Sequence, residues 1–252
     1  MDSWVYFCVV FVCIAGGVLF GWLLRRALPG HHLSEDTKDV VRLGTGLIAT
    51  IAALVLGLLI ASAKTSFDMR NTQVKQLIAN VILIDGFLTA YGAEAATARA
   101  LLRHDVQGMA AQIWNEQAAG PSKAPYVVSQ GAFAFYDALV ELAPGNGAQE
   151  SPKSRAIQAS TELAKARLLL FADADNPIPM LFLAVLIFWL TIIFASFSLF
   201  AQPNGLAMGF LFVCGLSAAG AIYLIVELGH PFNGAMQISS APLRHSLVPL
   251  SP

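Results

Sequence analysis

Residues 44–91 read GTGLIATIAALVLGLLIASAKTSFDMRNTQVKQLIANVILIDGFLTAY. The first part, Gly44–Ala63, has no charged residue and 20 positions, and a helix needs about 20 mostly apolar residues to cross a bilayer core. Neither proline nor glycine occurs in residues 58–85. We therefore expect this span to continue beyond the membrane as one helix ending at Tyr91, about 70 Å long at 1.5 Å per residue.

The composition of the whole chain agrees with a membrane protein. Of 252 residues, 56% are apolar and only 12% are charged, whereas soluble domains have about 25% charged residues. Residues 3–24, 43–63 and 176–226 contain no charged residue at all. An ordinary soluble enzyme is excluded. The net charge of −1 predicts no nucleic-acid partner, and the expected partner is the lipid bilayer.

Four segments are long and apolar enough to span a membrane as helices. They are Trp4–Leu24, Gly44–Ala63, Ile178–Phe200 and Leu206–Leu228. We predict an all-α integral membrane protein with four transmembrane helices and a helical extramembrane bundle between spans two and three. This divides the chain into residues 1–63, 64–177, 178–228 and 229–252. The last two spans are joined by a short turn, so we expect them to form an antiparallel hairpin.

The extramembrane region is expected to hold three more helices after the extension of span two. Breaks rich in Gly and Pro at residues 120–125 and 143–147 separate them. The predicted helices cover Ala93–Gln117, Tyr126–Leu142 and Ser151–Ala174.

An apolar stripe recurs every seven residues along the extension, at Phe67, Val74, Val81 and Leu88. Such spacing occurs both within a chain and between subunits. One interpretation is that the stripe packs against the predicted helix of residues 151–174. The other is that it also faces a neighbouring subunit, which would give a homo-oligomer around an axis.

Basic residues near the spans predict the orientation. Four Lys or Arg lie in residues 25–43, and six lie close to the membrane on the other side. The six are Lys64, Arg70, Lys75, Lys165, Arg167 and Arg244. The difference favours a multi-pass protein of the bacterial inner membrane with residues 64–177 in the cytoplasm, although Arg25 and Arg26 argue for the reverse.

No motif of an enzyme or a metal site is present. The three cysteines, Cys8, Cys13 and Cys214, lie inside predicted spans, where a thiol acts as a small apolar group. His31 and His32 lie near acidic residues, for which a solvated loop is a better explanation than a metal site. We expect no catalytic residue, no metal and no cofactor.

Candidate pore-lining residues lie on one face of span two: Leu47, Thr50, Ile51, Leu54 and Leu58. The alternative for the threonine is a hydrogen bond to a carbonyl of its own helix. Three charged residues at the ends of spans are candidates for a pore mouth, namely Lys64, Asp68 and Glu227. Local ion pairs or snorkelling would explain them equally. No ionisable residue lies at the middle of a span, which argues against an ion-coupled transporter.

Small residues in the spans predict close helix packing. Gly17-x-x-x-Gly21 lies in span one and Gly205-x-x-x-Gly209 at the start of span four. The pattern does not distinguish packing within the chain from packing between chains.

The tail after span four reads ELGHPFNGAMQI at residues 227–238 and Ala-Pro-Leu at 241–243. Pro231 ends a helix, Phe232 offers a bulky anchor, and Gly234 permits a sharp turn. The motif is expected to fold the tail against the helical domain, or to act only as a helix stop.

This tail resembles that of a bacterial bestrophin-like domain family of unknown function. Residues 53–68, ALVLGLLIASAKTSFD, and residues 73–92, QVKQLIANVILIDGFLTAYG, are also similar to that family's second span and its extension. The resemblance covers nearly the whole chain and implies a distant architectural likeness to bestrophins, which are pentameric anion channels. The acidic calcium clasp and the aromatic neck of bestrophins are absent, so gating by calcium does not carry over.

Two functions are expected from these observations. The first is an oligomeric channel for small inorganic ions, with span two lining the pore. The alternative is a membrane-anchored helical scaffold or sensor that transports nothing.

Overall fold

The computed structural model describes residues 3–27, 35–115, 130–172, 180–200, 205–232 and 234–246. Within these residues the chain is helical and contains no strand, which confirms the predicted all-helical class. The helices are α1 (Ser3–Ala27), α2 (Glu35–Tyr91), the 3₁₀ turn η2 (Ala93–Ala95), α3 (Ala96–Asn115), α4 (Gln130–Glu141), α5 (Gly147–Ala172), α6 (Met180–Phe200), α7 (Gly205–Leu228) and α8 (Ala241–Ser246).

Four of these helices, α1, α2, α6 and α7, are long and apolar enough to cross a membrane. They contain the four predicted spans. The chain forms two compact units, which are described separately below. One comprises Met1–Phe67 and Pro177–His230, and the other comprises Asp68–Asn176 and Pro231–Pro252.

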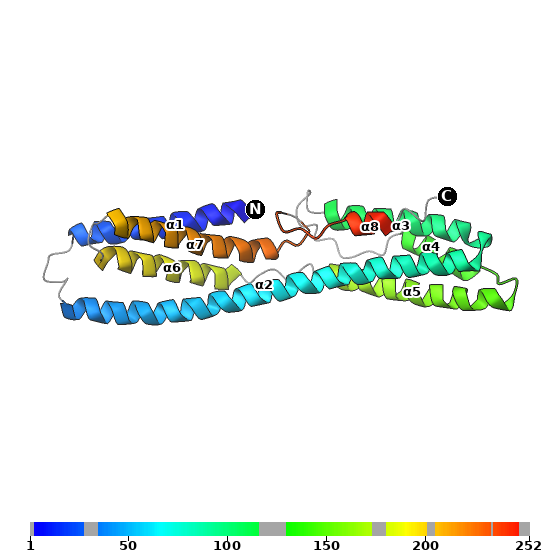
Figure 1. The fold of residues 1–252 in the computed structure, drawn as a ribbon, viewed down its shortest axis with the longest axis horizontal. Helices are drawn as coiled ribbons and strands as arrows, with labels where there is room; N and C mark the ends of the chain where they lie inside the picture. The colour runs from blue at the N-terminus through cyan, green and yellow to red at the C-terminus, as the bar shows by residue number, and fades with distance from the viewer. Residues whose placement is uncertain are drawn as a thin grey trace. The chain divides into compact units, whose positions relative to one another are not determined.

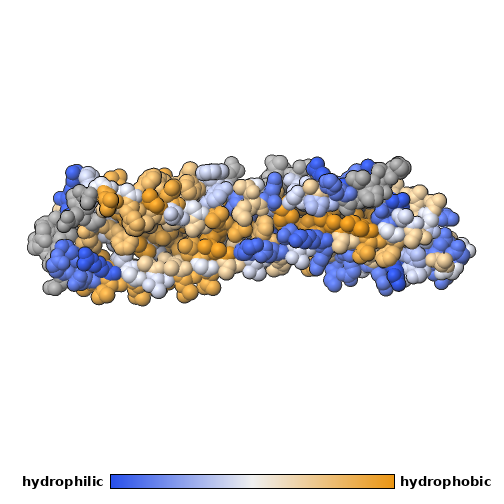
Figure 2. Space-filling view, viewed as in Figure 1, coloured by the Kyte–Doolittle hydropathy of each residue, from blue (hydrophilic) through white to orange (hydrophobic). Residues whose placement is uncertain are grey.

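In the first unit, α1 packs against both α6 and α7, and the three helices lie side by side (Figure 1). Ile14 of α1, Leu186 of α6 and Ile222 of α7 are fully buried in its core. Apolar residues cover most of the visible face of this unit in Figure 2. A bundle that is apolar both inside and outside is typical of membrane helices, since lipid replaces water around it.

Two glycines allow the close approach of α1 and α6. A Cβ added to Gly17 would lie 2.7 Å from the carbonyl oxygen of Thr191, and one added to Gly21 would overlap the carbonyl oxygen of Ala195. A side chain at either position would push the two backbones apart. In contrast, nothing lies within 4 Å of such a Cβ at Gly205 or Gly209. The first small-residue motif therefore packs within the chain, and the second has no such neighbour.

The helix α2 begins at Glu35, before the predicted start at Gly44, and continues without a break through Lys64 to Tyr91. The early start has a local cause. Glu35 lies in the first turn, where a carboxylate is favourable beside the positive end of the helix dipole. Its Oε1 accepts a hydrogen bond of 2.6 Å from Nζ of Lys38. This contact lowers the pKa of Glu35 below its usual value.

In the second unit, the predicted stripe of α2 is buried within the chain. Val74, Val81 and Leu88 are at most 3% exposed. The same side of the helix also buries Leu77, Ile84 and Tyr91. Buried residues of α3 (Leu102, Val106, Met109), α4 (Phe135, Leu139) and α5 (Leu163, Leu170) supply the rest of its core. The stripe thus forms part of an intrachain core, as the first interpretation predicted.

The turn after α2 requires glycine. Gly92 has φ 122° and ψ −169°, a conformation that is essentially restricted to glycine. The carbonyl oxygen of Tyr91 accepts a hydrogen bond of 2.9 Å from Nε2 of Gln149 in α5. This contact joins the end of α2 to the start of α5.

Several predicted helix bounds need correction. Helix α5 begins at Gly147 instead of Ser151, because Oδ1 of Asn146 caps it by accepting the Gln149 backbone N–H at 3.1 Å. Helix α3 begins at Ala96, after the 3₁₀ turn. The short helix α8 in the tail was not predicted. The predicted ends at Gln117, Tyr126 and Ala174 lie outside the described residues.

Candidate functional site

The candidate pore-lining face of α2 is exposed in the chain. Leu47, Leu54 and Leu58 have 64%, 66% and 63% of their surface exposed, and Ile51 has 41%. The helix is held to the first unit by its opposite side. Ala52 is buried in the core there, and Ile48, Ala49, Leu56 and Leu59 pack against it. The four candidate residues therefore make up a face that the rest of the chain does not cover.

Thr50 lies on the same exposed side, but its hydroxyl is already used. Its Oγ1 donates a hydrogen bond of 2.9 Å to the carbonyl oxygen of Gly46. Thr65, Thr72 and Thr89 make the equivalent bond to the residue four positions earlier. These hydroxyls thus satisfy themselves on their own helix, and the face they share with the leucines stays weakly polar.

The exposed positions continue at seven-residue spacing along the whole of α2. Beyond Leu58, every position of the two series that start at Leu47 and Ile51 is exposed. These positions are Ala61, Thr65, Asp68, Thr72, Lys75, Ala79, Ile82, Gly86 and Thr89. We call this the exposed seam of α2. Sequence analysis missed it because the larger apolar residues of the buried stripe gave a stronger signal.

The three candidate pore-mouth charges have different surroundings. Lys64 and Asp68 are exposed on α2, one turn apart. The Lys64 ammonium lies 5.6 Å from the centre of the Phe67 ring. Glu227, in the last turn of α7, is only 2% exposed, so its carboxylate does not face solvent. Lys64 and Asp68 accompany the exposed seam, and Glu227 does not.

The tail motif ends α7 and reverses the chain. The Gly229 backbone N–H donates to the carbonyls of Ile225 and Val226, at 3.2 and 3.1 Å. Pro231 follows, and Gly234 has φ 94°, in the region that favours glycine. The backbone N–H of Ile238 donates to the carbonyl of Pro231 at 2.6 Å. The sequence predicted this sharp turn.

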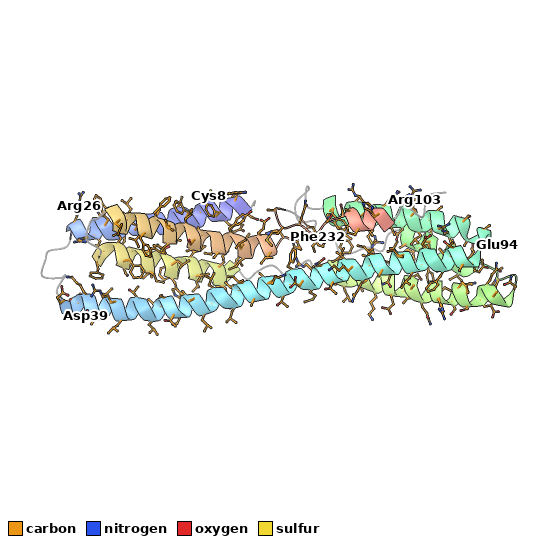
Figure 3. All side chains as sticks on the ribbon, viewed as in Figure 1. Cys8, Arg26, Asp39, Glu94, Arg103 and Phe232 are labelled. Carbon is orange, nitrogen blue, oxygen red and sulfur yellow. The ribbon has the colours of Figure 1, made fainter. Side chains whose placement is uncertain are left out.

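Trp114 of α3 holds the tail in place through two contacts. Its ring meets that of Phe232 edge-on, with centroids 5.8 Å apart and planes at 81°. Its Nε1 donates a hydrogen bond of 2.9 Å to the carbonyl oxygen of Ile238. Phe232 is labelled in Figure 3. The tail therefore lies against the helical unit. Sequence analysis did not single out Trp114, since nothing in the local pattern indicates its partner.

A buried ion pair lies between α3 and α5, and it too was missed. Nη1 of Arg167 lies 3.2 Å from Oδ1 of Asp105, and their side chains are 4% and 7% exposed. Nη2 of Arg167 donates a hydrogen bond of 3.1 Å to Oε1 of Gln112. The pattern counted Arg167 only as a basic residue near the membrane. Its burial shows that it serves the core of the helical unit.

No metal centre is found in the described part of the chain. There, no group of three His, Cys, Asp or Glu residues could hold a metal ion. Cys8, Cys13 and Cys214 are free thiols. His31 and His32 lie outside the described residues.

Comparison with known proteins gives one match. The model of the family described as bestrophin-like domain matches residues 11–243. No curated protein and no solved structure matches the chain significantly.

Proposed function

The chain belongs to the bestrophin-like domain family, and on this basis we propose that it is an integral membrane protein that forms a homo-oligomeric channel for small inorganic ions, with α2 lining the path. The observation that carries the proposal is the exposed seam of α2.

Membrane insertion is supported by the outer surfaces of the first unit. Large apolar side chains are exposed on α1, α6 and α7, including Trp4, Phe20, Phe188, Leu206 and Phe210, each at least 61% exposed. In water such a surface would promote aggregation. In a bilayer the same side chains face lipid tails. We further propose a location in the cell membrane, with residues 64–177 on the cytoplasmic side.

Oligomerisation is supported by the composition of the exposed seam. The lipid-facing surfaces of α6 and α7 hold phenylalanines, whereas residues 44–66 of α2 contain no aromatic residue. A Cβ added to Gly46 or Gly57, on the exposed side of α2, would have no atom within 4 Å, so no contact within the chain requires these glycines. Small residues are typical of helix–helix interfaces in membranes. This surface thus suits a neighbouring helix better than lipid.

The charges beside the exposed seam support ion passage. Rotational symmetry would repeat Lys64, Asp68 and Lys75 as rings around the axis, and charged rings at a pore mouth attract or repel ions. Two of the three are positive, which favours anions. The part of the seam inside the membrane, from Leu47 to Leu58, would form an apolar constriction.

A second function, a membrane-anchored scaffold, is favoured by one observation. Phe133, Tyr136 and Val140 of α4 are 58%, 44% and 47% exposed. They lie three and four residues apart and so share one face of the helix. Such a face suits a protein partner, and a scaffold of this kind would not need a central axis.

The proposal is tested on purified full-length protein. Its oligomeric state in nanodiscs is measured by mass photometry, and the same preparation is reconstituted for planar-bilayer recording. We expect an oligomer with measurable conductance. A folded oligomer that conducts no common ion would exclude the channel, and a monomer or dimer would favour the scaffold.

A matched pair of variants tests the path itself. Leu58 lies on the exposed seam, and Ile60, 39% exposed, lies roughly 160° away around the same helix. We expect Leu58→Asn to raise conductance because it wets an apolar constriction, and Ile60→Asn to leave it unchanged. Equal effects of the two changes would show that α2 does not line the path with this face.

A further inference from the structure

We propose that Arg25 and Arg26, in the last turn of α1, form a binding site for the phosphate of an anionic phospholipid headgroup. The inference rests on the proposed membrane insertion, but it does not depend on channel activity.

The position of the two arginines suits a headgroup. They follow directly on the charge-free residues 3–24 and form the basic last turn of α1. The guanidinium of Arg26 lies over the Trp22 ring, with its Cζ 3.8 Å from the centroid. Tryptophan is enriched at the membrane–water interface, and stacking holds a cation at its ring. Arg26 is therefore held at the depth of the headgroups (Figure 3).

The positive charges of this turn have no compensating acid within the described part of the chain. No ion pair is found there for Arg25 or Arg26. Nη1 of Arg25 is covered by protein atoms and makes no hydrogen bond to the described residues, while the side chain as a whole is partly exposed. A partly covered cation without a counter-charge is unfavourable. An anion on its exposed side would relieve that cost.

Other basic residues in the same unit are already compensated. Nζ of Lys38 lies 2.6 Å from Oε1 of Glu35, and Nη1 of Arg42 lies 3.6 Å from Oδ1 of Asp39. These two cations at the start of α2 have acidic partners on their own helix. Arg25 and Arg26 differ in this respect, so an external anion is expected at the end of α1 and not at the start of α2.

The chemistry of the side chains selects phosphate. A guanidinium presents N–H donors in a planar fork that matches two phosphate oxygens, which a lysine ammonium does not. Phosphatidylglycerol adds a net negative charge that phosphatidylcholine lacks. Basic residues beside a span attract anionic lipid more strongly than neutral lipid.

The test measures binding of phosphatidylglycerol and phosphatidylcholine to delipidated full-length protein, through the shift of its thermal unfolding with lipid concentration. For the unchanged protein we expect clearly tighter binding of phosphatidylglycerol. The double variant R25Q/R26Q should bind it on the order of 10-fold more weakly, since each basic residue contributes to the attraction. The control variant K38Q/R42Q should bind it as the unchanged protein does.

Further arms keep the result unambiguous. R25K/R26K preserves the charge and the fold but removes the forks, and we expect intermediate binding; undiminished binding would overturn the proposal. The same holds if R25Q/R26Q keeps full affinity, if K38Q/R42Q loses as much, or if inorganic phosphate alone reproduces the shift. Flotation with liposomes checks insertion separately. Failure to float would overturn the membrane proposal, whereas flotation without a preference for anionic lipid would overturn this site alone.

Discussion

Asp105 of α3 and Arg167 of α5 form a buried ion pair, with 3.2 Å between Oδ1 and Nη1. Gly131 of α4 lies against it, because a Cβ there would come within 3.3 Å of Oδ1 of Asp105. Three helices of the second unit therefore meet at this pair. The interaction explains why two charged residues occupy a core that is otherwise apolar.

Removal of one partner of this pair should destabilise the second unit. We expect Arg167→Met to lower the free energy of unfolding by about 3–5 kcal/mol, since it leaves the Asp105 carboxylate buried without its counter-charge. Chemical denaturation in detergent measures the change. The control is Lys165→Met, because the Lys165–Glu162 pair is 66% and 61% exposed, and such pairs contribute about 0–1 kcal/mol. Equal losses in the two variants would contradict the assignment.

The tail should detach when its contacts with Trp114 are removed. Phe232 is 9% exposed, and Phe232→Ala should cost about 3–5 kcal/mol as the cavity beside Trp114 forms. Trp114→Phe removes only the hydrogen bond to Ile238 and should cost about 1 kcal/mol. Hydrogen exchange is the measurement, with faster exchange expected at the Ile238 amide. Met236→Ala is the control, because Met236 is 44% exposed, and it should leave exchange unchanged.

Substitution of Gly21 should disrupt the first unit. Gly21→Leu places a side chain against the Ala195 carbonyl, so α1 and α6 can no longer pack closely. We expect a large loss of monodisperse protein in size-exclusion chromatography and a lower melting temperature. Gly16→Ala is the matched control, since nothing lies within 4 Å of the added Cβ. It should be neutral or raise stability by up to about 1 kcal/mol through helix propensity.

The turn at Gly92 gives a prediction about backbone strain. Its φ of 122° costs a residue with a side chain about 1–3 kcal/mol. Gly92→Ala should therefore lower the free energy of unfolding by that amount. Gly108→Ala in the exposed part of α3 has open space around the added Cβ and should not destabilise. If Gly92→Ala unfolds like the unchanged protein, the described turn is incorrect.

Lys75 should influence ion selectivity if the proposed channel exists. It lies on the exposed seam of α2, where symmetry would create a ring of positive charge. Lys75→Glu should move the reversal potential in a salt gradient towards cations, as measured in planar bilayers. Lys165→Glu is the control, because its exposed side chain lies on α5, and it should leave the reversal potential unchanged.

Much of this architecture follows from local patterns. The charge-free runs identify α1, α2, α6 and α7, because a membrane span requires only length and apolar character. The absence of Pro and Gly from residues 58–85 predicts that α2 continues through Lys64. Pro231 and Gly234 predict the reversal after α7, since each restricts or frees the backbone at its own position. Such features depend on neighbours along the chain.

Contacts between distant residues could not be derived in this way. Both the buried stripe and the exposed seam of α2 have seven-residue spacing, so periodicity defines two faces without assigning either to the core. Packing against the other helices makes that choice. Asp105 pairs with Arg167, and Trp114 with Phe232, across long separations in the chain. A side chain's type shows that it needs a partner, but only the folded arrangement of helices brings a particular partner within reach.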